Sequence, residues 1–182
     1  MRKVIVSEFV SLDGVIESPD KWQFPYWNDE TAQFKHSELF AIDALLLGRV
    51  TYEGFAAAWP SMTDEQGYAD RMNSLPKYVI STTLDKAEWN NSTLIKANIV
   101  EEISKLKQQP GQDILIFGSG TLVQTLIQHD LIDQYNLLVY SIVLGAGKHL
   151  FQDGSNAALK LSEAKAFSSG VVALIYQPER KA

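Results

Sequence analysis

The segment FGSGTL, residues 117–122, places two glycines and two hydroxyl side chains between an apolar run and a helix-like pattern. A strand that turns through glycines into a helix presents free backbone N–H groups at the positive end of the helix dipole. Gly118 and Gly120 would let a pyrophosphate approach this backbone. Hydrogen bonds would then come from the hydroxyl groups of Ser119 and Thr121. The same segment is equally compatible with a tight turn that binds no ligand.

The segment is a poor match to the dinucleotide-binding fingerprint of the Rossmann fold. That fingerprint needs a third glycine, and Val123 occupies the corresponding position. The segment also lies late in the chain, and no acid follows about twenty residues on at a strand end. A Rossmann dehydrogenase is therefore disfavoured.

A second apolar run leads into a similar turn in the segment LLLGRVTYE, residues 45–53. Gly48 and Arg49 come directly after the buried run, and Thr51 begins a short helix-like pattern. A guanidinium group at this place would fork onto a phosphate, and the threonine hydroxyl would donate to it. The alternative interpretation is a surface arginine beside a helix cap.

A third strand-like segment, KYVIST at residues 77–82, ends in Ser81 and Thr82. Small hydroxyl side chains at a strand end suit an adenosine or its phosphate, although they also suit an ordinary polar strand end. Taken together, three strand-to-loop transitions offer donors for phosphate groups. An extended dinucleotide needs such donors along one edge of a sheet.

The elements that must position these turns alternate between strands and helices in the first part of the chain. Strands are predicted from β-branched and apolar runs at residues 3–12, 43–48, 77–82, 92–96, 113–117, 134–144, 159–167 and 171–177. Helices are predicted from a cap at Asn28 to near Ile42, over residues 51–59 and 98–109, and after the glycine turn, where Leu122, Val123, Leu126 and Ile127 share a side. This order predicts one α/β domain over residues 1–182, with a mostly parallel sheet and an antiparallel C-terminal end.

Composition excludes several classes of site. The chain has 182 residues, a formal net charge of -6 and no cysteine. The acidic balance argues against a nucleic-acid or anionic-membrane surface, and the lack of thiols excludes disulfides. The histidines lack metal-ligand spacing, so no metal is expected. The N-terminus shows no signal peptide and no apolar stretch is long enough to span a membrane, so a cytoplasmic location is expected.

Four segments together resemble the dihydrofolate-reductase-like superfamily. They are SLDG after the first strand, GRVTYE after the second, FGSGTLVQTLIQHDLID, and SIVLGAGKHLF. The segments GSGTLVQTL and LGAGKHLF are most similar to the branch that contains the reductase domain of riboflavin biosynthesis, the C-terminal domain of RibD. The resemblance extends from Lys3 to about Tyr176. It implies the superfamily's fold, a central mixed sheet with helices on both faces.

The resemblance also implies an NADPH-dependent reductase and a role for individual residues. Arg49 would bind the 2′-phosphate of the cofactor, and Asp13 would lie in the loop over the nicotinamide. The remaining residues implied to contact NADPH are Phe9, Ser11, Gly48, Thr51, Ser81, Thr82, Gly118, Ser119, Gly120, Thr121 and Leu122. For Asp13, a turn aspartate before glycine and a catalytic or substrate-binding residue are both open interpretations.

Reduction of a C=N bond also requires a proton, which an acid in an apolar pocket can supply. Glu30 lies four residues before Phe34 on one face of the predicted helix. This resembles the pattern that carries the active-site carboxylate of dihydrofolate reductases, although the upstream aromatic Trp27 is closer than usual. Acids in the first turn of a helix are also common because of the helix dipole alone.

The function expected from this resemblance is reduction of a small nitrogen heterocycle or sugar-derived imine, as in the riboflavin-pathway step that reduces a ribosylamino-pyrimidine. Two alternatives remain open, dihydrofolate reductase itself and a nucleotide-binding module without catalysis. The expected partners are a small-molecule substrate and a second copy of the chain in a homodimer. The apolar strand NLLVYSIVL, residues 136–144, would suit either the pairing surface or the core.

Overall fold

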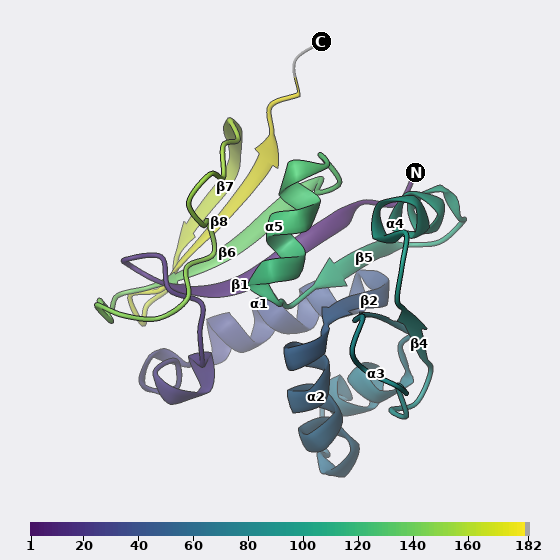
Figure 1. Cartoon of the computed structure of the whole chain (residues 1–182). Coiled ribbons are helices and arrows are strands. Elements are labelled where there is room, and N and C mark those ends of the chain that lie inside the picture. Colours follow the sequence, from purple (N-terminus) through teal and green to yellow (C-terminus); the bar gives the residue numbers. More distant parts are fainter. Residues whose placement is uncertain (181–182) are drawn as a thin grey trace.

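Six parallel strands form most of one continuous sheet, and two antiparallel strands extend it at one side. The computed structural model describes residues 1–180, and within them eight strands lie in the order β4-β3-β2-β5-β1-β6-β8-β7 (Figure 1). Strands β1 to β6 pair in parallel, whereas β8 runs antiparallel to both β6 and β7. The strands are β1 (Val4–Ser11), β2 (Ile42–Gly48), β3 (Lys77–Ile80), β4 (Ser92–Ile95), β5 (Asp113–Ile116), β6 (Gln134–Tyr140), β7 (Leu159–Ala166) and β8 (Val172–Pro178). The predicted mixed sheet with a late antiparallel end is confirmed.

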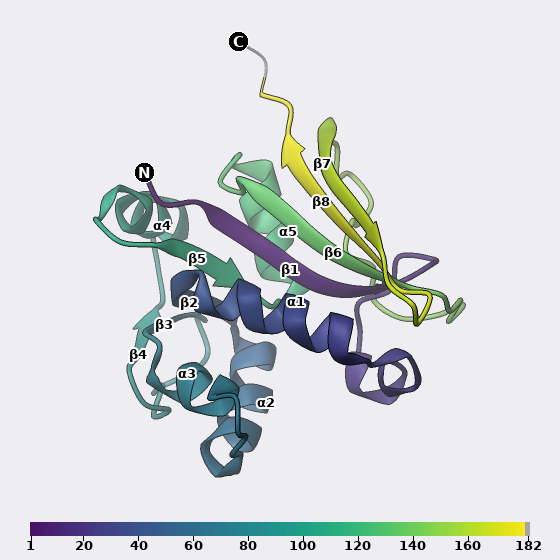
Figure 2. The same cartoon turned by 180° about the vertical axis from the view of Figure 1, so that it is seen from behind.

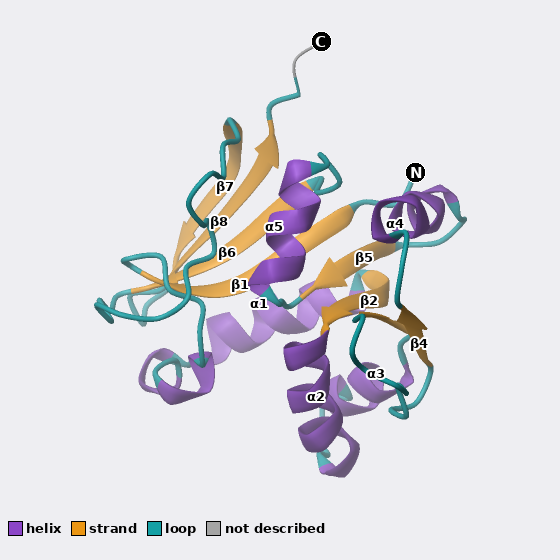
Figure 3. Ribbon diagram, in the orientation of Figure 1, coloured by secondary structure: helices purple, strands orange, loops and turns teal. Residues whose placement is uncertain are grey.

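Helices cover both faces of the sheet, as Figures 1 and 2 show from opposite sides. The helices are α1 (Asp29–Phe40), α2 (Arg49–Ala58), α3 (Tyr68–Ser74), α4 (Ile99–Gln108) and α5 (Gly120–Gln128). One core lies between the sheet and α4 and α5, and a second lies between the sheet and α1, α2 and α3. Figure 3 shows that β2 leads directly into α2, whereas a short loop joins β5 to α5. No helix within residues 1–180 is long and apolar enough to cross a membrane.

Some predicted element ends were correct and others were wrong. Asn28 caps α1, because its side chain accepts a hydrogen bond from the backbone N–H of Thr31. Asn98, with which the predicted helix over residues 98–109 begins, precedes α4 in a left-handed conformation with a φ of 54°, and its side chain makes no capping bond. The strand predicted at residues 134–144 ends at Tyr140. Beyond that residue the chain bends, and the N–H of Ile142 donates to the carbonyl of Tyr140. Helix α3 was not predicted.

The strand β6 belongs to the core and is not available as a pairing surface. It lies between β1 and β8, so both of its edges are already hydrogen-bonded. Leu137, Leu138 and Tyr140 are buried. Residues 136–140 therefore belong to the core, whereas residues 141–144 lie beyond the strand and include the exposed Val143. The homodimer stays a prediction.

A buried lysine fixes the start of β3, the third strand of the predicted binding edge. Lys77 is fully buried, and its Nζ donates to the carbonyls of Asn73, Leu75 and Asn90 at 2.8, 2.8 and 3.0 Å. The Nζ also lies 4.1 Å from the centroid of the Trp89 ring. Burial lowers the pKa of Lys77 to about 8. One side chain thus ties α3 and the β3–β4 loop to the strand.

We predict that Lys77→Met lowers the free energy of unfolding by about 3 kcal/mol, because three backbone carbonyls, one of them in a buried hydrogen bond, lose their donor. Urea unfolding followed by far-ultraviolet circular dichroism measures the change. Lys160→Met is the matched control: Lys160 is an exposed residue of β7, and its replacement should change the unfolding free energy by less than about 0.5 kcal/mol. Equal free energies of unfolding for the two variants would show that the buried hydrogen bonds of Lys77 do not stabilise the fold.

Candidate functional site

The turns that follow β2 and β5 touch each other, and this contact forms the centre of the site. The backbone N–H of Gly48 donates to the carbonyl of Gly118 at 3.1 Å. A β-carbon at Gly48 would overlap the side chain of Ser119 and lie 2.9 Å from its backbone nitrogen. Gly118 has a φ of +116°, and a β-carbon there would lie 2.9 Å from Thr51 Oγ1. Only glycines allow this approach, which brings the N-termini of α2 and α5 together.

The start of α5 is partly open to solvent. Ser119 is the N-cap residue, and its hydroxyl oxygen accepts a hydrogen bond from the backbone N–H of Leu122 at 3.4 Å. Gly118 is buried, Ser119 and Gly120 are half-buried, and Thr121 is exposed. The side chain of Ile16 closes one side of the turn, with its Cδ1 3.3 Å from the β-carbon position of Gly120. The exposed part of the turn still presents backbone donors at a helix N-terminus, which suits an anion.

The third predicted strand end lies at the same edge of the sheet. Ile80 pairs with Gly48 in the register of β3 and β2, so Ser81 follows directly beside the glycine contact. Ser81 is buried, and its hydroxyl oxygen accepts from the backbone N–H groups of Thr83 and Leu84 at 3.2 and 3.0 Å. Thr82 is exposed. The Ser81 hydroxyl therefore stabilises the turn after β3, whereas the side chain of Thr82 is exposed to solvent.

Arg49 lies at the first position of α2 and pairs with an acid on the same helix. Its guanidinium is 2.9 Å from Glu53 Oε2, and both side chains are about half exposed, at 45% and 47%. Exposed pairs of this kind contribute about 0–1 kcal/mol, so a phosphate can compete for the arginine. The structure places Arg49 beside the glycine contact but with its charge partly neutralised.

Asp13 joins the loop after β1 to the loop after β6. Its carboxylate accepts hydrogen bonds from the Ser11 hydroxyl at 2.6 Å and from the backbone N–H groups of Gly145 and Leu144 at 2.8 and 3.1 Å. These bonds, that of Ser11 first, lower the pKa of Asp13 to about 2. The group is therefore ionised at neutral pH, which disfavours proton donation. Ser11 and Asp13 hold the loop in position, and any catalytic role of Asp13 stays a prediction.

The carboxylate of Glu30, like that of Asp13, accepts hydrogen bonds from a neighbouring loop. Its Oε2 accepts from the backbone N–H and the hydroxyl of Ser168 at 2.6 and 2.8 Å. Both bonds lower the pKa of Glu30. The residue ties the start of α1 to the turn between β7 and β8, and it is ionised at neutral pH. This environment is unlike the apolar pocket that a proton donor needs.

Aromatic residues surround Phe9 on the α1 face of the sheet. The Phe9 ring meets Trp27 and Tyr140 edge-on, at centroid distances of 6.3 and 5.6 Å. Trp22 is buried against Tyr140, whereas Phe24 is 65% exposed. The loop at residues 17–27 thus contributes partly to the core and partly to the surface.

A buried polar cluster that the sequence analysis missed lies beside Phe9. Lys35 Nζ donates to Glu38 Oε2 at 2.5 Å and to the Ser7 hydroxyl at 2.6 Å. Asn136 donates to the other oxygen of Glu38 at 2.7 Å. Lys35 and Glu38 are three residues apart on α1, and Ser7 interrupts the apolar run of β1. That interruption was the only sequence signal for the cluster.

Glu8 was likewise not predicted to be a site residue. It lies in the middle of β1, is 8% exposed, and its Oε1 has no hydrogen-bond partner among residues 1–180. Burial raises the pKa of Glu8 to about 8, against an opposing effect of Lys35 and a smaller supporting effect of Glu38. The signal was present in the sequence, since Glu8 is the one charged residue in the apolar segment VIVSEFVS.

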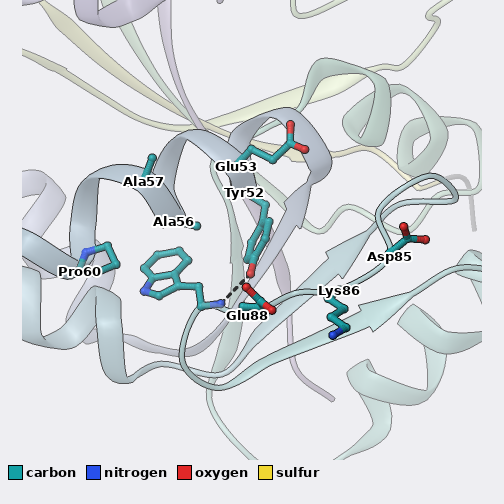
Figure 4. Close-up of a pocket in the computed structure, with 9 residues that line it drawn as sticks. Tyr52, Glu53, Ala56, Ala57, Pro60, Asp85, Lys86 and Glu88 are labelled. Carbon is teal, nitrogen blue, oxygen red and sulfur yellow. Dashed lines mark hydrogen bonds between the residues drawn. The ribbon is translucent and has the colours of Figure 1, made fainter.

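A hollow of about 660 Å³ lies between α2 and the loop that follows β3 (Figure 4). Tyr52 and Trp89 form part of its wall, and the backbone N–H of Trp89 donates to the Tyr52 hydroxyl at 2.9 Å. Three carboxylates and one ammonium line it, those of Glu53, Asp85, Glu88 and Lys86. The excess of negative charge makes the hollow a poor site for phosphate groups.

Comparison with known proteins shows matches over nearly the whole chain. The sequence model of the RibD C-terminal domain matches residues 2–173. The chain is 35% identical over 179 residues to the uncharacterized protein YyaP of Bacillus subtilis, covering 96% of this chain and 94% of that protein. It is 30% identical over 175 residues to the uncharacterized protein YwjB of the same organism, covering 93% and 95%.

Solved structures with the same fold include reductases. A protein from Shewanella sp. PV-4 that is named after riboflavin biosynthesis superposes with a TM-score of 0.76 at 21% identity, over 98% of this chain and 99% of that chain. A pyrimidine reductase-like protein from Corynebacterium diphtheriae gives 0.68 at 12%, over 99% and 93%. The dihydrofolate reductase of Enterococcus faecalis, complexed with NADP(H) and RAB-propyl, gives 0.64 at 17%, over 98% and 97%. The expected dihydrofolate-reductase-like fold is confirmed.

We predict that Gly48→Ala lowers the free energy of unfolding by about 1–3 kcal/mol, because the new methyl group forces Ser119 away from its place. Thermal and urea unfolding measure the loss. Gly54→Ala is the control on the same helix: nothing lies within 4 Å of its β-carbon position. That substitution should raise stability by up to about 1 kcal/mol through helix propensity. A Gly48→Ala protein as stable as the wild type would show that the two turns do not require their close contact.

Proposed function

The chain belongs to the RibD C-terminal domain family, and on this premise we propose that it is an NADPH-dependent reductase of a small nitrogen heterocycle or sugar-derived imine. The family and the similar folds support reductase chemistry in general. The choice of cofactor is supported by the NADP(H) complex of the dihydrofolate reductase with the same fold. The choice of substrate class rests on the family alone.

The observation that carries the proposal is the contact between Gly48 and Gly118, which places two helix N-termini at the carboxyl ends of adjacent parallel strands. Ligands of open α/β sheets bind at this edge. We infer that a diphosphate would bind at this turn, where a β-carbon on either glycine would be too close to its neighbours. Backbone N–H groups and the hydroxyls of Thr51 and Thr121 would donate to it. The residues present therefore suit the cofactor without any cationic side chain at the diphosphate itself.

The places of the adenosine and the nicotinamide are inferred from the order of the strands along this edge of the sheet. Arg49 and Thr82 flank the glycine contact on the side of β3, so the adenosine end with its 2′-phosphate would lie there. Phe9 and the loop held by Asp13 flank it on the side of β1, so the nicotinamide would lie there. When bound, the cofactor would supply a hydride. The proton that reduction of a C=N bond also needs would come from solvent, because Asp13 and Glu30 are ionised at neutral pH. The residues of this chain would orient the cofactor.

Two alternatives make different demands on the same residues. Dihydrofolate reductase activity would need an acid in an apolar substrate pocket, but Glu30 is ionised and bound to the turn between β7 and β8. A nucleotide-binding module would keep the glycine contact and Arg49 but reduce no substrate. The family match makes the riboflavin-pathway pyrimidine the first compound to test.

We predict that Arg49→Ala weakens NADPH binding by roughly 10- to 100-fold and leaves NADH binding nearly unchanged, because one charge-assisted phosphate contact is lost. Quenching of the fluorescence of the four tryptophans on titration with each cofactor measures both dissociation constants. Glu53→Gln is the matched control, since it frees Arg49 from its partner, and it should bind NADPH as well as or better than the wild type. An unchanged preference for NADPH over NADH in Arg49→Ala would show that Arg49 does not bind the 2′-phosphate.

We predict that the protein consumes NADPH with a ribosylamino-pyrimidine as substrate and not with dihydrofolate. The loss of NADPH absorbance at saturating cofactor measures both reactions. Consumption with dihydrofolate alone would identify a dihydrofolate reductase. Tight NADPH binding without consumption of either compound would favour the binding module.

A further inference from the structure

An acidic side chain lies directly against the turn that the proposed function assigns to a diphosphate. Glu8 Oε1 is 3.5 Å from the β-carbon position of Gly118, and Thr51 Oγ1 is 2.9 Å from the same position. The carboxyl group and the hydroxyl group therefore flank one side of the glycine. Glu8 is more than nine-tenths buried, and its Oε1 accepts no hydrogen bond from any residue that the structure describes. A buried polar atom without a partner calls for an explanation.

The charges around Glu8 do not hold it in the ionised form. Lys35 on α1 is already paired, with its Nζ 2.5 Å from Glu38 Oε2. On α2, Arg49 pairs with Glu53 at the surface. Helix α5 has no charged residue between Gly120 and Gln128. The register neighbour of Glu8 on β6 is the apolar Leu137. On β5 the residues from Ile114 to Ile116 are apolar, and Asp113 lies at the far end of that strand, before the Val4–Ile114 pair.

We propose that Glu8 is a positioning residue of the dinucleotide site, and that it must carry a proton for a diphosphate to bind at the turn of residues 118–122. This inference rests on the proposed function, because it takes the diphosphate of NADPH as the ligand. An uncharged carboxyl group beneath the turn leaves the positive ends of α2 and α5 free to attract the anion. A carboxylate at the same place would oppose the anion across a region of low dielectric constant, where charges interact more strongly than in water.

The consequence is a coupling between proton binding and cofactor binding. Burial raises the pKa of Glu8 to about 8 in the free protein, and a bound diphosphate raises it further, since the negative ligand favours the neutral acid. Well below pH 8 the proton is already present, so this group makes no contribution to the pH dependence of binding. Above pH 8 the ligand must draw a proton onto Glu8, so affinity falls by up to tenfold for each pH unit.

The test measures the dissociation constant of NADPH by tryptophan fluorescence between pH 6.5 and 9.5. We expect a constant value for the wild type at low pH and a rise above about pH 8. Glu8→Gln, which has the same shape and no charge, should keep the low-pH affinity and lose the rise. The 2′-phosphate of the ligand titrates near pH 6 and affects both proteins equally. Glu53→Gln removes an exposed carboxylate on α2 and should keep the wild-type dependence on pH.

A second measurement needs no variant. At pH 8, calorimetric titration of the wild type with NADPH in buffers of different ionisation enthalpy should show uptake of about half a proton, because about half of the Glu8 side chains are then ionised. Glu8→Gln, if folded, should take up none. NADPH binding with the same pH profile in the wild type and Glu8→Gln, or without proton uptake, would overturn the role of Glu8 and leave the proposed function intact. No NADPH binding by the wild type at any pH would overturn both.

Discussion

The contact between Gly48 and Gly118 is the constraint on which the site depends. In the parallel pair of β2 and β5, Leu46 lies opposite Ile116. Strand β2 leads directly into α2, and β5 reaches α5 through residues 117–119. Both helices can begin there only if no β-carbon lies between the two turns, since it would overlap Ser119 or Thr51. The same lack of side chains leaves backbone donors facing one point. The packing of the two turns and the anion site proposed here therefore have a single structural cause.

The three acids Asp13, Glu30 and Glu8 differ in charge because their surroundings differ. The Ser11 hydroxyl and then backbone N–H groups lower the pKa of Asp13. The backbone N–H and the hydroxyl of Ser168 lower the pKa of Glu30. Glu8 is buried without a donor, so its pKa rises to about 8. Asp13 and Glu30, which the sequence suggested as catalytic acids, therefore hold loops in place. Glu8, which was not predicted to be a site residue, lies against Gly118 at the centre of the site.

The two faces of β1 separate two kinds of polar environment. On one face Glu8 lies against Gly118 and Thr51, where the diphosphate is proposed to bind. On the other face Lys35 and Glu38 neutralise each other beside Phe9, with an aromatic group around them. Alternation of side chains along a strand makes this separation possible within adjacent residues. Under the proposed function, the diphosphate end and the nicotinamide end of the cofactor would therefore meet side chains on opposite faces of β1.

The sequence by itself determined the order and type of most elements, the mostly parallel sheet and the turns that form the binding edge, because local periodicity and glycine turns encode these features. It also supplied the family, through segments such as FGSGTL and LGAGKHLF. Only the tertiary structure decided what each acid does. The pKa of Glu8, Asp13 or Glu30 depends on donors and burial contributed by residues up to 138 positions away, and no local pattern records such distant neighbours.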